Sequence, residues 1–314
     1  MTRILFAAFI VLLNYNSFAL NPVQLEKKLE QLVDKEKAGM VFIDLKSGCE
    51  LSIGGSREFP AASVAKLPVM AAAYHLSQNG IINLNNKIQF READRMEGSG
   101  VLRWMKAGRS YTIFNLIRLM IVLSDNSATK MLVDCIGAPV VNGYLAEAGI
   151  TKTRITDHTM LVEPPSAEVN MTTPYEMAVL VRKIFKQDGF NKESARQMLS
   201  FMKSQKYRWG IWRGVPPGVI VADKTGNLEK ILNDVGIVYT KNGCYILSIF
   251  THGYAKQRDA RIMINEISKV VYEEYTGEKV IQKKKKIIRK YKKKLSRKRR
   301  YNRIRHLRSA KFTH

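Results

Sequence analysis

The sequence has 314 residues, of which 46% are hydrophobic, the composition of a normal globular protein. This length allows one large domain or two subdomains with a sizeable core, and the composition excludes a wholly disordered chain. The net charge of +25 is concentrated at one end, because residues 279–314 hold 18 of the 52 Lys and Arg residues and none of the 27 Asp and Glu residues. The preceding residues carry 34 positive and 27 negative side chains, so the body is only mildly basic.

The N-terminus has the features of a secretory signal peptide over residues 1–19. Arg3 supplies a positive start, residues 4–13 are apolar, and Ser17-Phe18-Ala19 places small residues before a cleavage site. We expect cleavage near Ala19 and an exported protein, periplasmic or secreted. The alternative is an uncleaved anchor, although the apolar run is shorter than a typical spanning helix.

Three cysteines, Cys49, Cys135 and Cys244, leave at least one thiol unpaired within a monomer. Neither their spacing nor that of the scattered histidines fits a metal site, so we expect no metal. Nothing in the sequence predicts a bridge between two of the cysteines, and we expect buried free thiols.

The first predicted elements are a helix and a β-hairpin. Asn21-Pro22 is a favourable helix start, and the apolar stripe that follows predicts a helix over residues 23–37. Strands are predicted over 40–45 and 49–53. From Ser63 to Lys206 the pattern is mainly helical. Helices are predicted from Ser63 onward and over 113–123, 128–136, 174–185 and 192–203, and residues 151–173 read as irregular.

After Tyr207 the sequence becomes rich in β-forming residues. Strands are predicted over 219–222, 236–240 and 244–251, followed by a closing helix over 260–275. Strands at both ends of the chain must meet to form one sheet, so the helical region is an insertion. We therefore predict an α+β fold, an α/β sandwich with a cleft at the boundary between its parts. Residues 20–60 and 213–278 form its sheet subdomain and residues 61–212 its helical subdomain.

Residues 279–314 form a separate basic tail. Like-charge blocks such as Lys283–Lys286 and Arg297–Arg300 repel one another and cannot bury a core, so we expect disorder or induced helix. In an exported protein the expected partners of the tail are anionic lipids or other anionic envelope polymers. Nucleic acid is less favoured, because the body shows no interleaved aromatic and basic surface. A solvated tail without a specific role is the remaining alternative.

Three short motifs combine a nucleophile, a base and anion-binding groups. Ser63-Val64-Ala65-Lys66 places a hydroxyl and an amine three residues apart on one helix face, as a nucleophile beside a base requires. Ser127–Lys130 and Ser200–Lys203 have the same spacing. The order and spacing of Ser124-Asp125-Asn126 and Lys224-Thr225-Gly226 select Ser63 over the other two serines.

With these motifs, the sequence resembles the class A serine β-lactamase family over residues 22–276. Four further stretches also fit: Gly98-Ser99-Gly100-Val101-Leu102, the apolar run 119–123, Val221-Ala222-Asp223 before Lys224, and Asn233-Asp234-Val235-Gly236 after it. The resemblance implies a five-stranded antiparallel sheet with flanking terminal helices, packed against a helical domain, with the active site between them. No cofactor is expected, and we expect a monomer.

The resemblance also implies how the reaction proceeds. Ser63 attacks an amide or β-lactam carbonyl and forms an acyl-enzyme. Lys66 takes or relays the serine proton, which requires a lysine pKa lowered by burial or by nearby positive charge, part of it from Lys224. Ser124 relays a proton to the leaving nitrogen, and Asn126 holds Lys66 or the substrate amide.

The third motif is expected to bind the substrate. Lys224 and Thr225 offer a cation and a hydroxyl donor to a substrate carboxylate, and Gly226 lets the strand approach the ligand closely. The backbone N–H groups of Ser63 and, by family position, Asn227 are expected to form the oxyanion hole.

The stretch that supplies the water-activating glutamate departs from the family pattern Glu-Pro-x-x-Asn. Glu163-Pro164 matches the start of the pattern and Glu168-Val169-Asn170 matches its end, with three extra residues between them. Glu163 is the preferred general base for deacylation, with Asn170 as its companion. Glu168 is the second candidate, and a plain surface loop is the alternative.

This departure leaves three functions open. With an active glutamate, the protein is a β-lactamase that confers antibiotic resistance. With slow deacylation, it is a penicillin-binding D,D-carboxypeptidase-like enzyme acting on peptidoglycan stem peptides. The third function is a catalytically weak envelope-binding protein anchored by its basic tail. Other hydrolase classes have little support, because the sequence contains neither Gly-x-Ser-x-Gly nor His-Glu-x-x-His.

Overall fold

The computed structural model describes residues 20–156 and 169–280. The predicted signal peptide, both loop glutamates (Glu163 and Glu168) and the basic tail from residue 281 onward lie outside these ranges. Within them, no helix is both long and apolar enough to cross a membrane.

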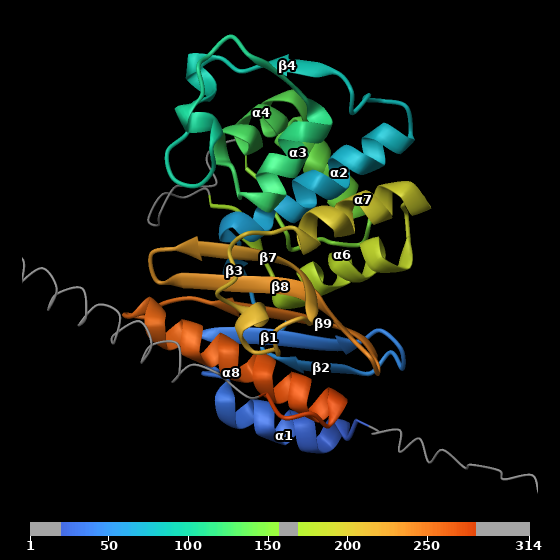
Figure 1. The fold of residues 1–314 in the computed structure, drawn as a ribbon, viewed down its shortest axis with the longest axis vertical. Helices are drawn as coiled ribbons and strands as arrows, with labels where there is room; N and C mark the ends of the chain where they lie inside the picture. Colours follow the sequence, from blue (N-terminus) through green and yellow to red (C-terminus); the bar gives the residue numbers. More distant parts are fainter. Residues whose placement is uncertain (1–19, 157–168, 281–314) are drawn as a thin grey trace, which may run out of the picture. The chain divides into compact units, whose positions relative to one another are not determined.

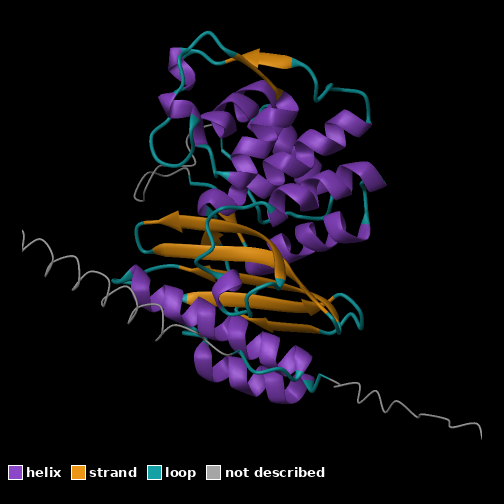
Figure 2. Cartoon of the chain, viewed as in Figure 1, coloured by secondary structure: helices purple, strands orange, loops and turns teal. Residues whose placement is uncertain are grey.

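A five-stranded antiparallel sheet forms the centre of the fold (Figures 1 and 2). Its order is β2-β1-β9-β8-β7, and the strands are β1 (Ala38–Asp44), β2 (Glu50–Ile53), β7 (Ile220–Leu228), β8 (Ile231–Thr240) and β9 (Gly243–Thr251). The N-terminal hairpin joins the C-terminal strands through β1 and β9, which pair from Ala38↔Thr251 to Asp44↔Tyr245. The predicted five-stranded antiparallel sheet and the α+β class are confirmed.

The two terminal helices lie side by side on one face of the sheet (Figure 1). Helix α1 (Pro22–Leu32) begins as predicted, because the Asn21 side chain accepts a hydrogen bond from the Gln24 backbone N–H and Pro22 occupies the first turn. It ends at Leu32 rather than Lys37. Helix α8 (Gln257–Thr276) buries an apolar stripe that includes Ile264, Ile267 and Val271.

Helices of the inserted region cover the other face. Helix α6 (Pro174–Lys186) packs directly on β1, β8 and β9. Beyond it lie α2 (Lys66–Gln78), α3 (Ile113–Val122), α4 (Asn126–Ile136), α5 (Ala138–Glu147) and α7 (Lys192–Lys203). Helix α2 is buried on nearly all sides, as expected for a helix that is apolar all round.

Short elements connect these layers. The four 3₁₀ turns are η1 (Ala62–Ala65), η2 (Glu92–Asp94), η3 (Leu102–Trp104) and η4 (Ile211–Arg213), among the described residues. Two small antiparallel pairs are formed by β3 (Phe59–Pro60) with β6 (Met171–Thr172) and by β4 (Lys87–Gln89) with β5 (Ser110–Thr112).

One predicted boundary is wrong in a way that affects the site. Lys224-Thr225-Gly226 lies inside β7 rather than after a strand, because β7 and β8 pair over their whole length and close in a short hairpin at Leu228↔Ile231. The helix predicted over 128–136 ends at Ile136 as expected. A further helix, α5, follows at once, with Pro139 in its first turn, where a missing N–H costs nothing.

Two predictions about side chains are also wrong. The cysteines are free, as expected, but they are not buried: Cys135 is exposed on α4, and Cys49 and Cys244 are partly exposed. The body also carries a basic and aromatic cluster, in which Arg208 and Arg213 lie against the Trp212 ring. Both guanidinium carbons lie within 5.4 Å of the Trp212 ring centroid, the range of a cation–π contact.

Candidate active site

Ser63 lies in the 3₁₀ turn η1, directly before the buried helix α2. The preceding residue, Ala62, has φ +47°, a left-handed conformation that costs energy for a side chain with a Cβ atom. The turn is held from outside, because the Ala61 N–H donates to the Asn170 carbonyl at 2.8 Å. Asn233 Nδ2 on β8 donates to the Ala61 carbonyl at 3.1 Å. These contacts tie the serine turn to the sheet.

Gly226 allows this turn to pack against the edge strand β7. A Cβ atom at Gly226 would lie 3.0 Å from the Ala61 carbonyl oxygen and 3.0 Å from the Ala62 Cβ atom. From the sequence, we expected Gly226 to let a ligand approach the strand closely. In the structure, the lack of a side chain at Gly226 lets the backbone before Ser63 approach the strand closely.

Lys66 is the first residue of α2, and its side chain points back to the serine. Its Nζ lies 3.1 Å from Ser63 Oγ, 3.0 Å from Ser124 Oγ and 2.8 Å from Asn126 Oδ1, and it donates to the Ser124 carbonyl at 2.7 Å. The residue is 0% exposed. Burial, followed by the positive charge of Lys224, holds the pKa of Lys66 well below its ordinary value. A lysine in this environment can act as a base at neutral pH.

Ser124 places its hydroxyl between two lysines. Its Oγ is 3.0 Å from Lys66 Nζ and 3.1 Å from Lys224 Nζ, and its φ of +52° is left-handed. Lys224 is fully buried and also donates to the Thr225 carbonyl at 2.7 Å. Burial lowers the pKa of Lys224 to about 7, against the opposing effect of Asp223 and Asp234. The hydroxyl can therefore exchange protons with either lysine.

Asp125 organises the middle motif. Its Oδ1 caps α4 by accepting from the Ala128 N–H at 2.9 Å, and its Oδ2 accepts from the N–H groups of Val101 (2.6 Å) and Leu102 (2.9 Å). Gly100 approaches so closely that a Cβ atom there would lie 2.3 Å from the Asp125 carboxyl carbon. One carboxylate therefore joins the start of α4 to residues 100–102.

Asn126 is fixed on both sides of its amide. Its Oδ1 accepts from Lys66 Nζ, and its Nδ2 donates to the Glu97 carbonyl at 2.7 Å. Of the two roles that the sequence left open, the geometry matches holding Lys66, because both amide atoms are already engaged.

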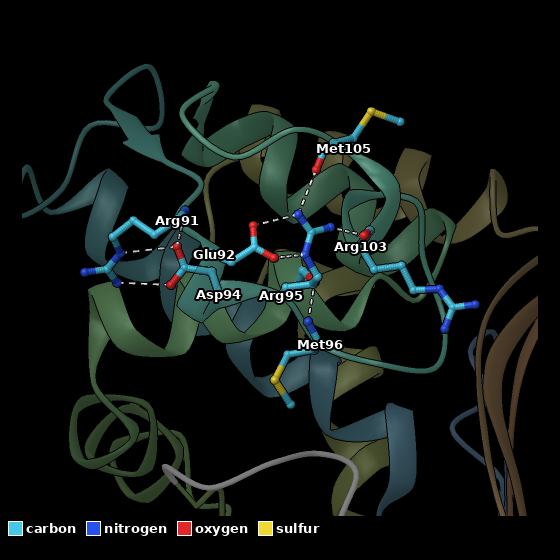
Figure 3. Close-up of polar contacts among 8 residues, drawn as sticks. Arg91, Glu92, Asp94, Arg95, Met96, Arg103 and Met105 are labelled. Atoms are coloured by element: carbon cyan, nitrogen blue, oxygen red, sulfur yellow. Dashed lines mark hydrogen bonds and ion pairs between the residues drawn. The ribbon is translucent and has the colours of Figure 1, made fainter.

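The segment from Arg91 to Met105 borders this motif and has its own polar framework (Figure 3). The Arg95 guanidinium donates to the Glu92 carboxylate and to the carbonyls of Arg103 and Met105. Arg91 pairs with the buried Asp94 at 3.0 Å. The Met96 N–H donates to Ser127 Oγ at 2.9 Å, which anchors the segment to α4.

Thr225 is buried on β7, and its hydroxyl is oriented by a residue that the sequence did not indicate. Gln205 Nε2 donates to Thr225 Oγ1 at 3.0 Å, so the hydroxyl proton is directed elsewhere. Asn227, further along the same strand, is exposed, and its Oδ1 accepts from Gln257 Nε2 at 2.9 Å. Gln205 follows α7 without any motif, and only its tertiary position reveals its role.

Asn170 stands where the described chain resumes after residue 168. It is buried, its Oδ1 accepts from the Thr156 N–H at 2.8 Å, and its carbonyl receives the Ala61 N–H. The Arg154↔Met171 bridge lies next to this contact. The two ends of the segment 157–168 are therefore joined two residues from Ser63. Glu163 and Glu168 lie outside the described residues.

The other two serine–lysine pairs have structural roles. Ser127 and Lys130 are on α4, where Lys130 pairs with Asp134 at 2.7 Å, away from Ser127. Lys203 on α7 lies over the Tyr239 ring, 4.4 Å from its centroid. The structure brings together only the first pair with the other two motifs, among the residues it describes.

A model of the Beta-lactamase enzyme family matches residues 24–275, and the chain belongs to this family. The structure of PBP-A is similar at 28% identity, covering 81% of this chain and 98% of PBP-A, with a TM-score of 0.74. The β-lactamase of Sphaerobacter thermophilus DSM 20745 is 27% identical over 81% and 97% of the two chains, with a TM-score of 0.74.

A third similar structure is a leucine-to-glutamate mutant of PBP-A in an acyl-enzyme complex with penicillin G. It is 29% identical, with 80% and 96% of the two chains covered and a TM-score of 0.73. Together with the site geometry, these matches make the protein a serine hydrolase of the β-lactamase superfamily with a class A-like fold.

Proposed function

We propose that the protein is an exported enzyme that opens β-lactam rings through an acyl-enzyme on Ser63 and so confers antibiotic resistance. The observation that carries this proposal is the buried Lys66 amine, 3.1 Å from Ser63 Oγ and with a lowered pKa. A neutral amine at this distance can take the serine proton. If export proceeds as the sequence predicts, the mature chain begins after Ala19, and its measured mass will show this.

The acylation step follows from the contacts of Lys66 and Ser124. As Ser63 Oγ bonds to the carbonyl carbon, its proton passes to the Lys66 amine, and the oxygen of the carbonyl takes up negative charge beside the N–H groups of Ser63 and Asn227. The C–N bond then breaks, and the leaving nitrogen takes the proton of Ser124 Oγ. Lys66 replaces that proton and returns to the neutral amine.

Substrate orientation is assigned to Lys224 and Thr225. A carboxylate on the substrate pairs with the Lys224 ammonium and accepts a hydrogen bond from the Thr225 hydroxyl. That hydroxyl is free to donate, because Gln205 Nε2 donates to Thr225 Oγ1 and leaves the hydroxyl hydrogen directed away from Gln205. A β-lactam and the C-terminus of a stem peptide both carry such a carboxylate, so this subsite supports both substrate classes.

Deacylation is assigned to Glu163, with Asn170 as its companion and Glu168 as the second candidate base. The chosen glutamate activates water to release the ester from Ser63. The altered spacing of this stretch and the similarity to PBP-A favour one second candidate function. It is a penicillin-binding D,D-carboxypeptidase-like enzyme of peptidoglycan metabolism, in which the acyl-enzyme persists.

The first prediction concerns the nucleophile. Ser63→Ala should abolish covalent labelling by a fluorescent penicillin, because it removes the hydroxyl that the Lys66 amine activates. Ser127→Ala is the matched control and should label like the wild type, since Ser127 accepts the Met96 N–H instead. Undiminished labelling of Ser63→Ala, seen on a denaturing gel, contradicts the proposal.

The second prediction separates the two candidate functions. A chromogenic cephalosporin should be turned over rapidly, with only a transient adduct in the mass spectrum, if the protein is a β-lactamase. Glu163→Gln should then accumulate the acyl-enzyme and slow turnover by about 10²-fold or more, the usual contribution of a general base. If Glu168→Gln shows this loss and Glu163→Gln does not, the general base is Glu168. A long-lived wild-type adduct supports the D,D-carboxypeptidase-like function.

A further inference from the structure

Two buried carboxylates lie behind Lys224 and have no part in the chemistry described so far. Asp223 on β7 is 3% exposed and Asp234 on β8 is 0% exposed, and their side chains contact each other. Asp234 Oδ2 accepts from the Ile211 N–H at 2.7 Å. Asp223 Oδ2 and Asp234 Oδ1 receive no N–H or O–H donor from any other described residue.

Glycines make room for both side chains. Gly236 is the cross-strand partner of Asp223, and a Cβ atom there would lie 2.7 Å from the Asp223 Cβ atom. A Cβ atom at Gly210 would lie 2.0 Å from Asp234 Oδ2. The loop before η4 can deliver the Ile211 N–H to Asp234 only because residue 210 has no side chain. The fold therefore encloses the pair from two directions.

Two ionised carboxylates in this enclosure would repel each other across their unpartnered oxygens. The positive groups that act on the pair are Lys224 on the same strand and Arg208 in the loop before η4. No described residue pairs with either aspartate as a salt bridge, and Lys224 Nζ is engaged by Ser124 Oγ and the Thr225 carbonyl. One proton shared by the two carboxyl groups removes the repulsion and supplies a donor within the pair.

We propose that Asp223 and Asp234 share one proton, with Asp223 donating to the ionised Asp234, and that this positioning pair keeps Lys224 positively charged for the substrate carboxylate. Asp234 is the ionised member because it already accepts a backbone N–H. The pair then carries a single negative charge opposite the single positive charge of Lys224. Burial of both groups raises the pKa of Asp223 well above its ordinary value, which agrees with this arrangement. The kinetic consequence rests on the proposed function, whereas the shared proton does not.

Infrared spectroscopy of the wild-type protein tests the shared proton directly. The carbonyl stretch of a protonated carboxyl group should be present at neutral pH, shift in D₂O, and disappear in Asp223→Asn. Asp94→Asn is the matched control, because Asp94 is 1% exposed but paired with Arg91, and it should leave the band unchanged. A wild-type spectrum without the band overturns the proposal even if every variant fails to fold, and so does a band that survives in folded Asp223→Asn.

Acylation kinetics test the effect on Lys224. Asp223→Asn keeps a donor toward Asp234 and should acylate within about threefold of the wild type. The double variant Asp223→Asn/Asp234→Asn removes the negative charge, so the pKa of Lys224 falls below its present value of about 7. At pH 7, a fall of one unit from a pKa of about 7 reduces the charged fraction of Lys224 about fivefold. Acylation should therefore drop about fivefold at pH 7, and its ratio to the wild-type rate should recover as the pH is lowered.

The methyl ester of the same β-lactam serves as the internal control. It has no carboxylate, so its acylation rate should change much less than that of the acid. Equal losses for acid and ester, or an unchanged pH profile in the folded double variant, contradict the role assigned to the pair. If the wild type is not acylated by either compound, the proposed function fails, and the infrared result still decides whether the proton is shared.

Discussion

At the scale of single residues, two lysines of the site contact the same hydroxyl, that of Ser124. Lys66 and Lys224 lie 3.0 and 3.1 Å from Ser124 Oγ, and both are fully buried. The positive charge of one lysine disfavours protonation of the other. The lysine without a carboxylate pair behind it, Lys66, is therefore the one suited to lose its proton and serve as the base.

This arrangement predicts the effect of removing one lysine. Lys224→Met should raise the pKa of Lys66, because the nearby positive charge that lowers it is lost. The neutral base then forms only at higher pH, so the ascending limb of the acylation profile should move to higher pH. Rates should be measured with the methyl ester of a penicillin, which does not need Lys224 for binding. Lys130→Met, a surface loss of the same charge, should leave the limb in place. A limb that stays in place in Lys224→Met argues against charge coupling.

At the scale of elements, the start of α4 depends on a glycine outside the helix. Gly100 has φ +111° and faces the Asp125 carboxylate. Gly108 has φ +92°, and a Cβ atom there would meet no atom of the described residues within 4 Å. The two glycines share a left-handed backbone and differ in crowding. Alanine at Gly108 therefore has only the conformational cost of a left-handed backbone, whereas alanine at Gly100 also has the steric cost of the contact with Asp125.

Chemical denaturation of two alanine variants measures this difference. Gly108→Ala should lose about 1–2 kcal/mol of unfolding free energy, the cost of a left-handed backbone. Gly100→Ala should lose roughly a further 1–3 kcal/mol, the cost of overpacking, and should also acylate more slowly because Asp125 and Asn126 move. Equal losses in both variants would show that the contact with Asp125 has no energetic weight.

The sequence predicted the elements better than it predicted their contacts. Periodicity located β9 and α3 to within a residue or two, because a strand or helix with one buried face repeats at a fixed interval. Periodicity missed the N-terminal half of β8 and all of α5. Asn is uncommon in strands, but the Asn233 side chain is held by hydrogen bonds to the Pro60 and Ala61 carbonyls. Pro139 suggests a helix end, but it is accommodated in the first turn of α5. The motifs indicated Ser63, Lys66 and Lys224, but Gln205 and Gly210 act through groups distant in the chain and leave no local signal.

At the scale of the whole molecule, the sequence predicts separate tasks for the body and the basic tail. Deleting residues 279–314 removes 18 positive charges and no negative ones. The truncated protein should lose salt-sensitive binding to vesicles that contain anionic lipid and to anionic envelope fractions, because that binding depends on the tail charge. Its hydrolysis of a chromogenic cephalosporin should be unchanged. Undiminished binding after the deletion supports a tail without a specific role.

The contacts of Asn170 link the two halves of the proposed reaction. Its Oδ1 accepts from the Thr156 N–H, and its carbonyl accepts from the Ala61 N–H, two residues before Ser63. The same residue is the proposed companion of the deacylating glutamate. A change that shifts the backbone at Asn170 should therefore disturb the position of the nucleophile as well as the release of the acyl group.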